Sequence, residues 1–380
     1  MKIAYIGQKG IPCRSGGVEK HVEDLATKMA ARGHEVFVYS RKHYVEGAPR
    51  NFKGVNLVYT PTINTKHLDA IVHTFTSTIH ALFQGFDIIH YHAIGPSFLS
   101  FLPRWLLWRT KVIATFHCQD WTHKKWNKFS QACLKAGAWM SVHAPHKTIA
   151  ISRLLQEYCA VQYGHEVDYI PYGVPEPKEC PPRLIAQKYN LKKDGYVLAV
   201  SRLVPHKQIH TLIKAWRDVD TEKSLVVVGG SSFTPQYARE LQELAAADQR
   251  VILAGEQSGQ IMAEFFSNAY AFTQPSESEG LPIAVLEAMS YGLGIVASDI
   301  PEHLEGAGQA ALYFHKNDQN DLREQLQKAL DDPKLTALKG LQAKKRVMQY
   351  FHWDNLIEQI EQLYQNCQKE DDKQLAFAKK

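Results

Sequence analysis

The chain has 380 residues, of which 45% are hydrophobic and 22% charged, and its formal net charge is +5 at pH 7. This composition is typical of globular proteins, and the length predicts about two domains. We find no uninterrupted apolar run of about 18 residues and no signal-peptide pattern, so we expect neither a transmembrane helix nor secretion.

The positive charge lies in the first half. Residues 1–180 hold 21 Lys and Arg against 13 Asp and Glu, whereas the remainder holds 23 against 26. A basic half favours an anionic acceptor or a membrane surface as partner. Because no nucleic-acid-binding module is recognisable, we expect no nucleic-acid partner.

The cysteines and histidines predict no metal or disulfide framework. The six cysteines are scattered without a Cys-x-x-Cys pair, and the histidines form no complete set of metal ligands. We therefore expect reduced thiols in a cytoplasmic protein, and no metal site.

The first half alternates between apolar strands and amphipathic helices. Strands are expected at 2–7, 35–40, 55–61, 86–92, 111–117, 148–152 and 167–171, and helices at 18–32 and within 62–82. This alternation is typical of a parallel α/β sheet. The early glycines lack the GxGxxG spacing of dinucleotide-binding proteins, which argues against a dehydrogenase.

Two glycines stand at the start of the first helix. Gly16 and Gly17 precede Val18, and backbone amides at a helix N-terminus bind phosphate. A turn that needs a positive φ angle explains them equally well.

Polar residues stand at the carboxyl ends of two expected strands, 86–92 and 111–117. His117 ends the strand at 111–117, and Asp120 comes three residues later. Open α/β sheets bind ligands at the carboxyl ends of their strands, so both residues are candidates for substrate contact. A histidine at a strand end is also often a packed or capping residue.

Tryptophans alternate with basic residues at 104–111 and 124–128. One interpretation is contact with a bilayer or a lipid-linked acceptor. The other is a helix with its tryptophans in the core and its basic groups in water.

A turn-rich segment with several prolines (171–182) predicts a linker, after which the second half repeats the α/β alternation. Strands are expected at 196–201, 224–230, 250–255, 269–274 and 295–297. Helices are expected at 210–216, 237–247, 282–291, 320–330 and from 351 onward, with a loop at 301–308.

The loop after the strand at 196–201 carries Arg202 and Lys207. A guanidinium fork and an ammonium form a clamp for a diphosphate and can stabilise a leaving group without a metal. Position alone is equally compatible with two solvated cations.

The segment from Pro275 to Asp299 predicts a strand–loop–helix–strand unit with charged groups where loop and helix meet. Gly280 allows close approach to the helix N-terminus, which attracts phosphate. Glu279 and Glu287 stand about 10 Å apart along the helix axis. That separation suits two ends of an elongated ligand, although Glu279 alone could be a solvated loop residue.

These motifs together resemble the retaining glycosyltransferases of family 4. SESEGLPIAVLEAMSYG (276–292) resembles their E-x7-E signature, and GGVEKHVEDLATKMAARGHEV (16–36) resembles their N-terminal domain. RLVPHK (202–207) is similar to their GRLxxxKG loop, and TFHCQDWTHKKW (115–126) to a THGxDWxxxKW pattern of a bacterial branch that builds surface glycans. The resemblance covers about residues 1–353.

The resemblance implies an α/β protein of the GT-B fold, with two Rossmann-like domains facing across a cleft. It implies an acceptor domain at 1–174, a nucleotide-sugar donor domain at 183–350, and a helix at 351–380 that returns to the first domain and ends in a frayed tail. The implied activity is transfer of a hexosyl or deoxyhexosyl group to a glycan or lipid-linked acceptor, with retention and without a metal or other cofactor. Cytoplasmic action at the inner face of the membrane, in polysaccharide or lipopolysaccharide assembly, is the expected setting.

The resemblance also implies roles for individual residues. Glu279 and His117 would contact the transferred sugar, Asp120 the acceptor hydroxyl, and Glu287 the ribose. Phosphates would meet Arg202 and Lys207, with amides at Gly16, Gly17, Gly280 and Leu281.

Four positions depart from the family pattern: Cys118 and Ser201 replace glycines, Gln208 replaces the glycine after Lys207, and Tyr172 replaces an asparagine. A nucleotide-sugar epimerase or hydrolase on the same fold, or a non-catalytic scaffold subunit, remain alternatives.

Overall fold

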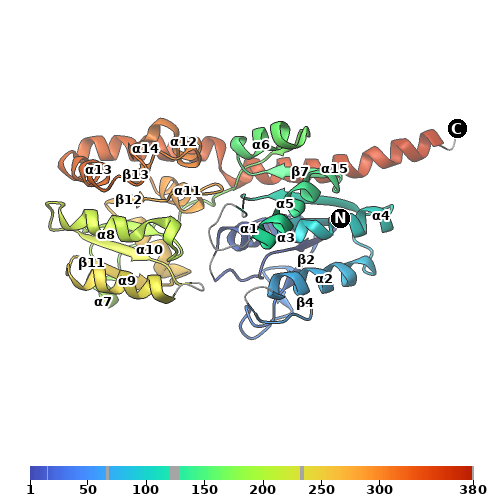
Figure 1. Cartoon of the computed structure of the whole chain (residues 1–380), viewed down its shortest axis with the longest axis horizontal. Helices are drawn as coiled ribbons and strands as arrows, with labels where there is room; N and C mark the ends of the chain where they lie inside the picture. The colour runs from blue at the N-terminus through green and yellow to red at the C-terminus, as the bar shows by residue number, and fades with distance from the viewer. Residues whose placement is uncertain (15, 66–67, 120, 122–127, 232–234, 379–380) are drawn as a thin grey trace. The chain divides into compact units, whose positions relative to one another are not determined.

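The computed structural model describes residues 1–14, 16–65, 68–119, 121, 128–231 and 235–378. The chain divides into two compact units, one of Met1–Tyr172 with Asp354–Lys380 and the other of Gly173–Trp353. Each unit is a largely parallel β-sheet with helices packed on it, as the alternation of elements predicts (Figure 1).

The sheet of the first unit has the order β3-β4-β2-β1-β5-β6-β7-β8, and all its pairs are parallel except β3–β4. Its strands are β1 (Lys2–Ile6), β2 (Glu35–Ser40), β3 (Asn51–Phe52), β4 (Val55–Tyr59), β5 (Ile88–His92), β6 (Lys111–Phe116), β7 (Lys147–Ala150) and β8 (Asp168–Tyr169). Strand β1 pairs with both β2 and β5. The chain therefore leaves β1 in one direction and returns on its other side, and such a switch point creates a ligand crevice at the carboxyl ends of the strands.

The helices of this unit are α1 (Gly17–Ala31), α2 (Leu68–Leu82), α3 (Ile94–Ser97), α4 (Phe101–Leu106), α5 (Lys128–His143), α6 (Arg153–Tyr163) and the terminal α15 (Trp353–Ala378). Alternation along β1 and β5 separates two faces of the sheet. Ala4, Ile6, Ile89 and Tyr91 form a core with Ala81 of α2. Tyr5 and His90 point to the other face, where they meet Tyr364 of α15.

Helix α15 packs onto the first unit through polar as well as apolar contacts. Glu361 accepts hydrogen bonds from Arg32 at 2.7 Å and is 2.9 Å from Nε2 of His34. The helix continues to Ala378, because residues 353–378 contain neither Gly nor Pro to end it. Fraying of this tail stays a prediction.

The sheet of the second unit has the order β11-β10-β9-β12-β13-β14 and is fully parallel. Its strands are β9 (Tyr196–Val200), β10 (Ser224–Val228), β11 (Val251–Gly255), β12 (Ala271–Gln274), β13 (Gly294–Ser298) and β14 (Ala311–Phe314). The switch point lies between β9 and β12, which pair directly.

The α-helices of the second unit are α7 (Leu184–Tyr189), α8 (Ile209–Arg217), α9 (Pro235–Ala246), α10 (Gln260–Asn268), α11 (Ile283–Ser290), α12 (Pro301–Ala307), α13 (Gln319–Asp331) and α14 (Pro333–Tyr350). The loop expected at 301–308 is wrong, because Pro301 occupies the first helical turn, where its missing N–H costs nothing. Helix α14 was not expected either. Asp332 caps it by accepting from the amide of Leu335.

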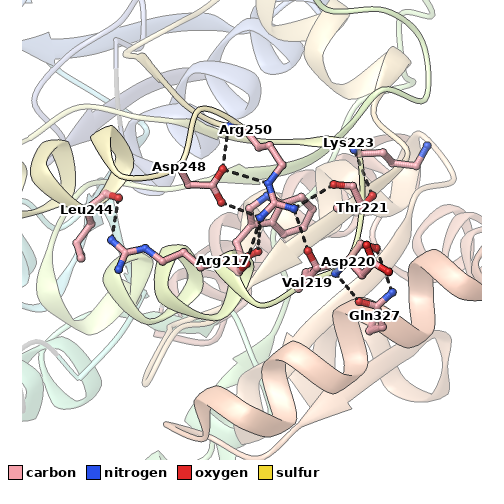
Figure 2. Close-up of polar contacts among 10 residues, drawn as sticks. Arg217, Val219, Asp220, Thr221, Lys223, Leu244, Asp248, Arg250 and Gln327 are labelled. Atoms are coloured by element: carbon pink, nitrogen blue, oxygen red, sulfur yellow. Dashed lines mark hydrogen bonds and ion pairs between the residues drawn. The ribbon is translucent and has the colours of Figure 1, made fainter.

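The partly buried side chain of Arg250 binds the carbonyl groups at the C-terminal end of α8 (Figure 2). Arg250 donates to the carbonyls of Trp216, Arg217, Val219 and Thr221, and it binds both carboxylate oxygens of Asp248. The last carbonyls of a helix have no partner within the helix, so one guanidinium satisfies several of them.

No helix among the described residues is long and apolar enough to span a bilayer.

Candidate functional site

The switch point of the second unit brings together a lysine and a glutamate that are 72 residues apart in the sequence. Lys207 ends the 3₁₀ turn Pro205–Lys207 after β9, and Glu279 lies in the loop after β12. Lys207 Nζ and Glu279 Oε1 form an ion pair in which both side chains are nearly buried. Two of the expected site residues therefore share one site.

Glu279 receives further hydrogen bonds from its own strand end. Ser276 Oγ donates to Glu279 Oε1 at 2.6 Å, and Gln274 Nε2 donates to the same oxygen at 3.3 Å. Burial by itself would raise the pKa of Glu279, but the ammonium of Lys207 and the hydrogen bonds from Lys207 and Ser276 lower it to about 2. The carboxylate is thus ionised at every physiological pH.

A second layer holds Ser276 in place. Ser298 Oγ, at the end of β13, donates to the carbonyl of Ser276 at 2.6 Å, and Nδ1 of His303 lies 3.0 Å from Ser298 Oγ. Burial lowers the pKa of His303 to about 4, so this imidazole is neutral at pH 7. Neither Ser298 nor His303 was expected at the site, because their positions depend on the packing of β13 and α12.

Gln208 stands where the family pattern has a glycine, and its backbone adopts the conformation that a glycine would favour. It has φ 55° and ψ 30°, the left-handed conformation that favours glycine. Its side-chain amide donates to Glu277 Oε1 at 2.6 Å and accepts from Thr211 Oγ1 at 2.6 Å. These bonds, with the backbone bond from Glu277 N to His206 O, join the loop after β9 to the loop after β12.

The remaining expected donor contacts lie around this pair. Gly280 and Leu281 come just before α11, and Glu287 is half-buried on the second turn of that helix. Arg202 is exposed at the end of β9. These residues lie on the strand–loop–helix segments that carry Lys207 and Glu279.

Two polar atoms at this edge of the sheet lack partners. Ser201 Oγ, after β9, and Gln274 Oε1, at the end of β12, are both shielded from solvent and have no hydrogen-bond partner among the described residues. Buried polar atoms of this kind can be satisfied by a water or a ligand.

The first unit places Gly16 and Gly17 at the start of α1. Gly16 has φ 109°, and a Cβ there would lie 2.2 Å from a carboxylate oxygen of Glu19. Glu19 Oε1 also accepts the amide of Lys9. The positive φ therefore favours glycine, whereas the Glu19 carboxylate is the end of a flexible side chain that can move, and no described side chain caps this helix.

His117 lies at the switch point of the first unit, but it is buried, with 2% of its surface exposed. Its Nδ1 lies 2.6 Å from the hydroxyl of Tyr172, and its Nε2 lies 3.1 Å from Nδ1 of His92. Both ring nitrogens are thus engaged within the protein. Of the two partners of His117, the sequence could have suggested His92. It follows His90 by two residues, so these two histidines share one face of β5.

His117 belongs to a cluster of rings that we call the histidine stack, in which His90, His92 and His117 stack and His21 meets His92 and His117 edge-on. The rings of His90 and His92 are 4.3 Å apart, and those of His92 and His117 5.4 Å apart, at interplanar angles near 28°. Burial lowers the pKa of His21 and His90 to about 3 and places those of His92 and His117 well below 6.5. These imidazoles are neutral hydrogen-bonding groups at pH 7.

Two predictions concern residues that the structure does not describe. Asp120 and residues 124–127 of the tryptophan-containing segment lie outside the described residues. Trp105 and Trp108 are described and are exposed, so the interpretation that placed the tryptophans of 104–111 in the core is wrong. Within the described part of the chain, no three His, Cys, Asp or Glu side chains are arranged to hold a metal ion.

Two protein-family models match this chain. Residues 15–176 match the family model "Glycosyltransferase Family 4", and residues 183–346 match "Glycosyl transferases group 1". O-antigen chain mannosyltransferase B of Escherichia coli is 28% identical over 204 residues, which are 52% of this chain and 51% of that protein. The match thus spans about half the length of that relative.

Solved structures match nearly the whole chain. Sucrose-phosphate synthase from Thermosynechococcus elongatus superposes with a TM-score of 0.82 at 20% identity, covering 96% of this chain and 98% of that one. Anabaena HepE, solved with UDP and glucose, gives 0.80 at 18% identity, covering 96% and 100%. At these identities the likeness concerns the fold.

Proposed function

Because the chain belongs to family 4 of the glycosyltransferases and has the GT-B fold, we propose that it is a retaining glycosyltransferase. Its donor is a nucleotide sugar carrying a hexose or deoxyhexose, and its acceptor is a glycan or a lipid-linked glycan. The mannosyltransferase relative is named for O-antigen, which supports a role in assembling a cell-surface polysaccharide.

The ion pair between Lys207 and Glu279 is the observation that carries the proposal. A donor diphosphate next to Lys207 would replace Glu279 as the ion-pair partner of the ammonium. The carboxylate of Glu279 would then accept hydrogen bonds from the hydroxyls of the sugar. Arg202 and the amides before α11 add positive charge for the phosphates. Glu287, further along α11, binds the ribose hydroxyls.

The reaction follows from these roles. The acceptor oxygen forms a bond to the anomeric carbon as the bond from that carbon to the phosphate oxygen breaks on the same face. The acceptor proton passes to the leaving phosphate, and Lys207 and Arg202 stabilise the charge that develops there. We propose that no metal takes part, because these cations and the helix N-terminus supply the charge that a metal would supply.

The acceptor is assigned to the first unit, with His117 and Asp120 as the candidate contacts. His117 would reach a substrate only if a substrate hydroxyl replaced Tyr172 or His92 as its partner. The six cysteines are free thiols, which fits a reducing compartment. We therefore place the reaction in the cytoplasm.

Titration calorimetry against UDP, GDP, dTDP and ADP in EDTA tests the donor site. We expect one nucleotide to bind, and the Arg202→Ala/Lys207→Ala variant to bind it at least tenfold more weakly, as expected for loss of two charge-assisted contacts. The matched control is Arg239→Ala/Lys345→Ala, which removes exposed cations from α9 and α14 of the same unit.

Transfer is then measured with the sugar nucleotide of that base, and the anomeric configuration of the product is read by NMR. A product with the donor's configuration supports retention, and an inverted product contradicts it. Equal binding by both double variants would place the phosphates elsewhere. Donor hydrolysis or epimerisation without transfer would favour the alternative enzyme class.

A further inference from the structure

Helix α2 is amphipathic, but its polar side chains face the interior and its large apolar side chains face solvent. Its buried positions are mostly polar or small: His73, Thr74, Ser77, Thr78 and Ala81. Its large apolar side chains, Leu68, Ile71, Phe75 and Ile79, are 36–64% exposed, and Phe83 just beyond it is 81% exposed. A surface helix of a globular protein normally buries its apolar stripe, so this stripe needs another partner.

The polar face of α2 is committed to the interior of the first unit. Thr78 Oγ1 bonds the hydroxyl of Tyr91 at 2.9 Å, and Ser77 Oγ bonds Thr60 Oγ1 at 2.8 Å. Rotation of the helix to bury its apolar stripe would break these bonds. The exposed stripe is therefore a property of the folded unit.

A neighbouring segment extends the same kind of surface. Helices α2 and α4 contact each other (Figure 1), and the end of α4 with the following turn exposes Trp105 and Trp108, at 74% and 64%. The Arg109 guanidinium lies 4.5 Å from the centre of the Trp108 ring. We call Ile71, Phe75, Ile79, Phe83, Trp105 and Trp108 the α2–α4 surface.

Acidic residues are few in the sequence that forms this surface. Asp69 is the single carboxylate of α2, and it is paired with Arg41 at 2.7 Å. Between Asp69 and Asp120 the sequence contains one other acidic residue, Asp87, whose carboxylate accepts the amide of Lys2 at 2.7 Å. Arg104 and Arg109 flank the tryptophans and have no acidic neighbour in this stretch of sequence.

We propose that the α2–α4 surface binds an anionic lipid bilayer, with the apolar stripe of α2 and the two tryptophans inserted at the level of the lipid headgroups. Tryptophan next to arginine is the combination that favours this interfacial zone, because the ring is amphipathic and the guanidinium meets lipid phosphate. The proposal goes beyond glycosyl transfer, and it would hold a catalytic domain against the membrane without a spanning helix.

The test is co-sedimentation of the full chain with vesicles of phosphatidylcholine alone or mixed with phosphatidylglycerol, without donor or acceptor. We expect binding to the mixed vesicles, weakened by salt, and at least tenfold weaker binding for Ile71→Asp/Phe75→Asp. The matched control is Leu338→Asp/Leu341→Asp, two exposed leucines of α14 in the second unit. Far-UV circular dichroism and the Tm verify that each variant is folded, and Trp105→Ser provides a second, milder variant.

Several results would overturn the proposal. These are no sedimentation of the wild type with mixed vesicles, equal binding by the α2 variant, or equal loss in the α14 control. Self-association that the α2 variant abolishes, without vesicle binding, would identify a second copy of the chain as the occupant instead. Because no substrate is present, none of these outcomes bears on the transferase activity.

Discussion

Lys207 and Glu279 form an ion pair that joins the loop after β9 to the loop after β12, at the switch point of the second sheet. In the proposed donor complex, the diphosphate would replace Glu279 as the partner of Lys207, and the sugar hydroxyls would replace Lys207 as the partners of Glu279. The same pair also dominates the electrostatics of this site, which makes its effect on stability depend on pH.

Lys207→Met should destabilise the protein more at about pH 7.5 than at about pH 4.5. In the wild type the pKa of Glu279 is lowered to about 2, so its contribution to folding is present above 4.5 and lost between 4.5 and 2. Without Lys207, burial raises that pKa above the unfolded value, and the carboxylate costs folding free energy as the pH rises. Breaking a buried pair costs about 3–5 kcal/mol.

Urea unfolding of wild type and variant at both pH values measures this difference, and effects of the histidines cancel between the two proteins. Lys207→Met/Glu279→Gln removes the unpaired charge and should recover most of the stability at the higher pH. A loss that is the same at both pH values would show that Glu279 stays ionised without Lys207.

Gln208 should be tolerant of glycine and intolerant of alanine. Gln208→Gly loses two side-chain hydrogen bonds but relieves the left-handed backbone, effects of about 1–2 kcal/mol each that nearly cancel. Gln208→Ala loses the bonds and keeps the strained φ of 55°, so we expect a loss of about 1–2 kcal/mol in the free energy of unfolding. If both variants lose the same stability, the backbone strain is not significant.

The histidine stack should make the protein sensitive to mild acid. Its four imidazoles are neutral when folded, because burial lowers the pKa of His21 and His90 to about 3 and the pKa of His92 and His117 well below 6.5, whereas the unfolded chain titrates near 6.5. Each therefore costs about 1.4 kcal/mol of folding free energy per pH unit below 6.5. Tm measured in steps from about pH 7.5 to about pH 5 should fall steeply below 6.5. A flat Tm over that range would contradict the burial of these rings.

Arg250→Ala should be among the more damaging substitutions at the edge of the second unit. It removes hydrogen bonds to four carbonyls and leaves Asp248 without its bidentate partner (Figure 2). We expect a loss of about 2–4 kcal/mol in unfolding by urea. The control Arg217→Ala, which removes one bond to the carbonyl of Leu244, should cost less than about 1 kcal/mol. Equal losses would mean that the helix end needs no cap.

Most strands and helices follow from the sequence, because hydrophobic periodicity is a local property of the chain. The period of apolar residues predicts β2 and the start of β9 to the residue, and it places Lys207 and Glu279 in loops at strand ends. The sequence predicts a loop at Pro301, but this residue begins α12, because proline suits the first turn of a helix as well as a loop turn.

The sequence by itself determined the two α/β units, the family resemblance and the candidate residues, because each depends on neighbours along the chain. Only the tertiary structure decided which partners those residues have. His117 meets His92 and Tyr172, and Lys207 meets Glu279, because strand order brings together loops that are 25, 55 and 72 residues apart. Periodicity shows that α2 has an apolar stripe but not which face meets the sheet. Hydrogen bonds from Ser77 and Thr78 turned the polar face inward and left the stripe exposed.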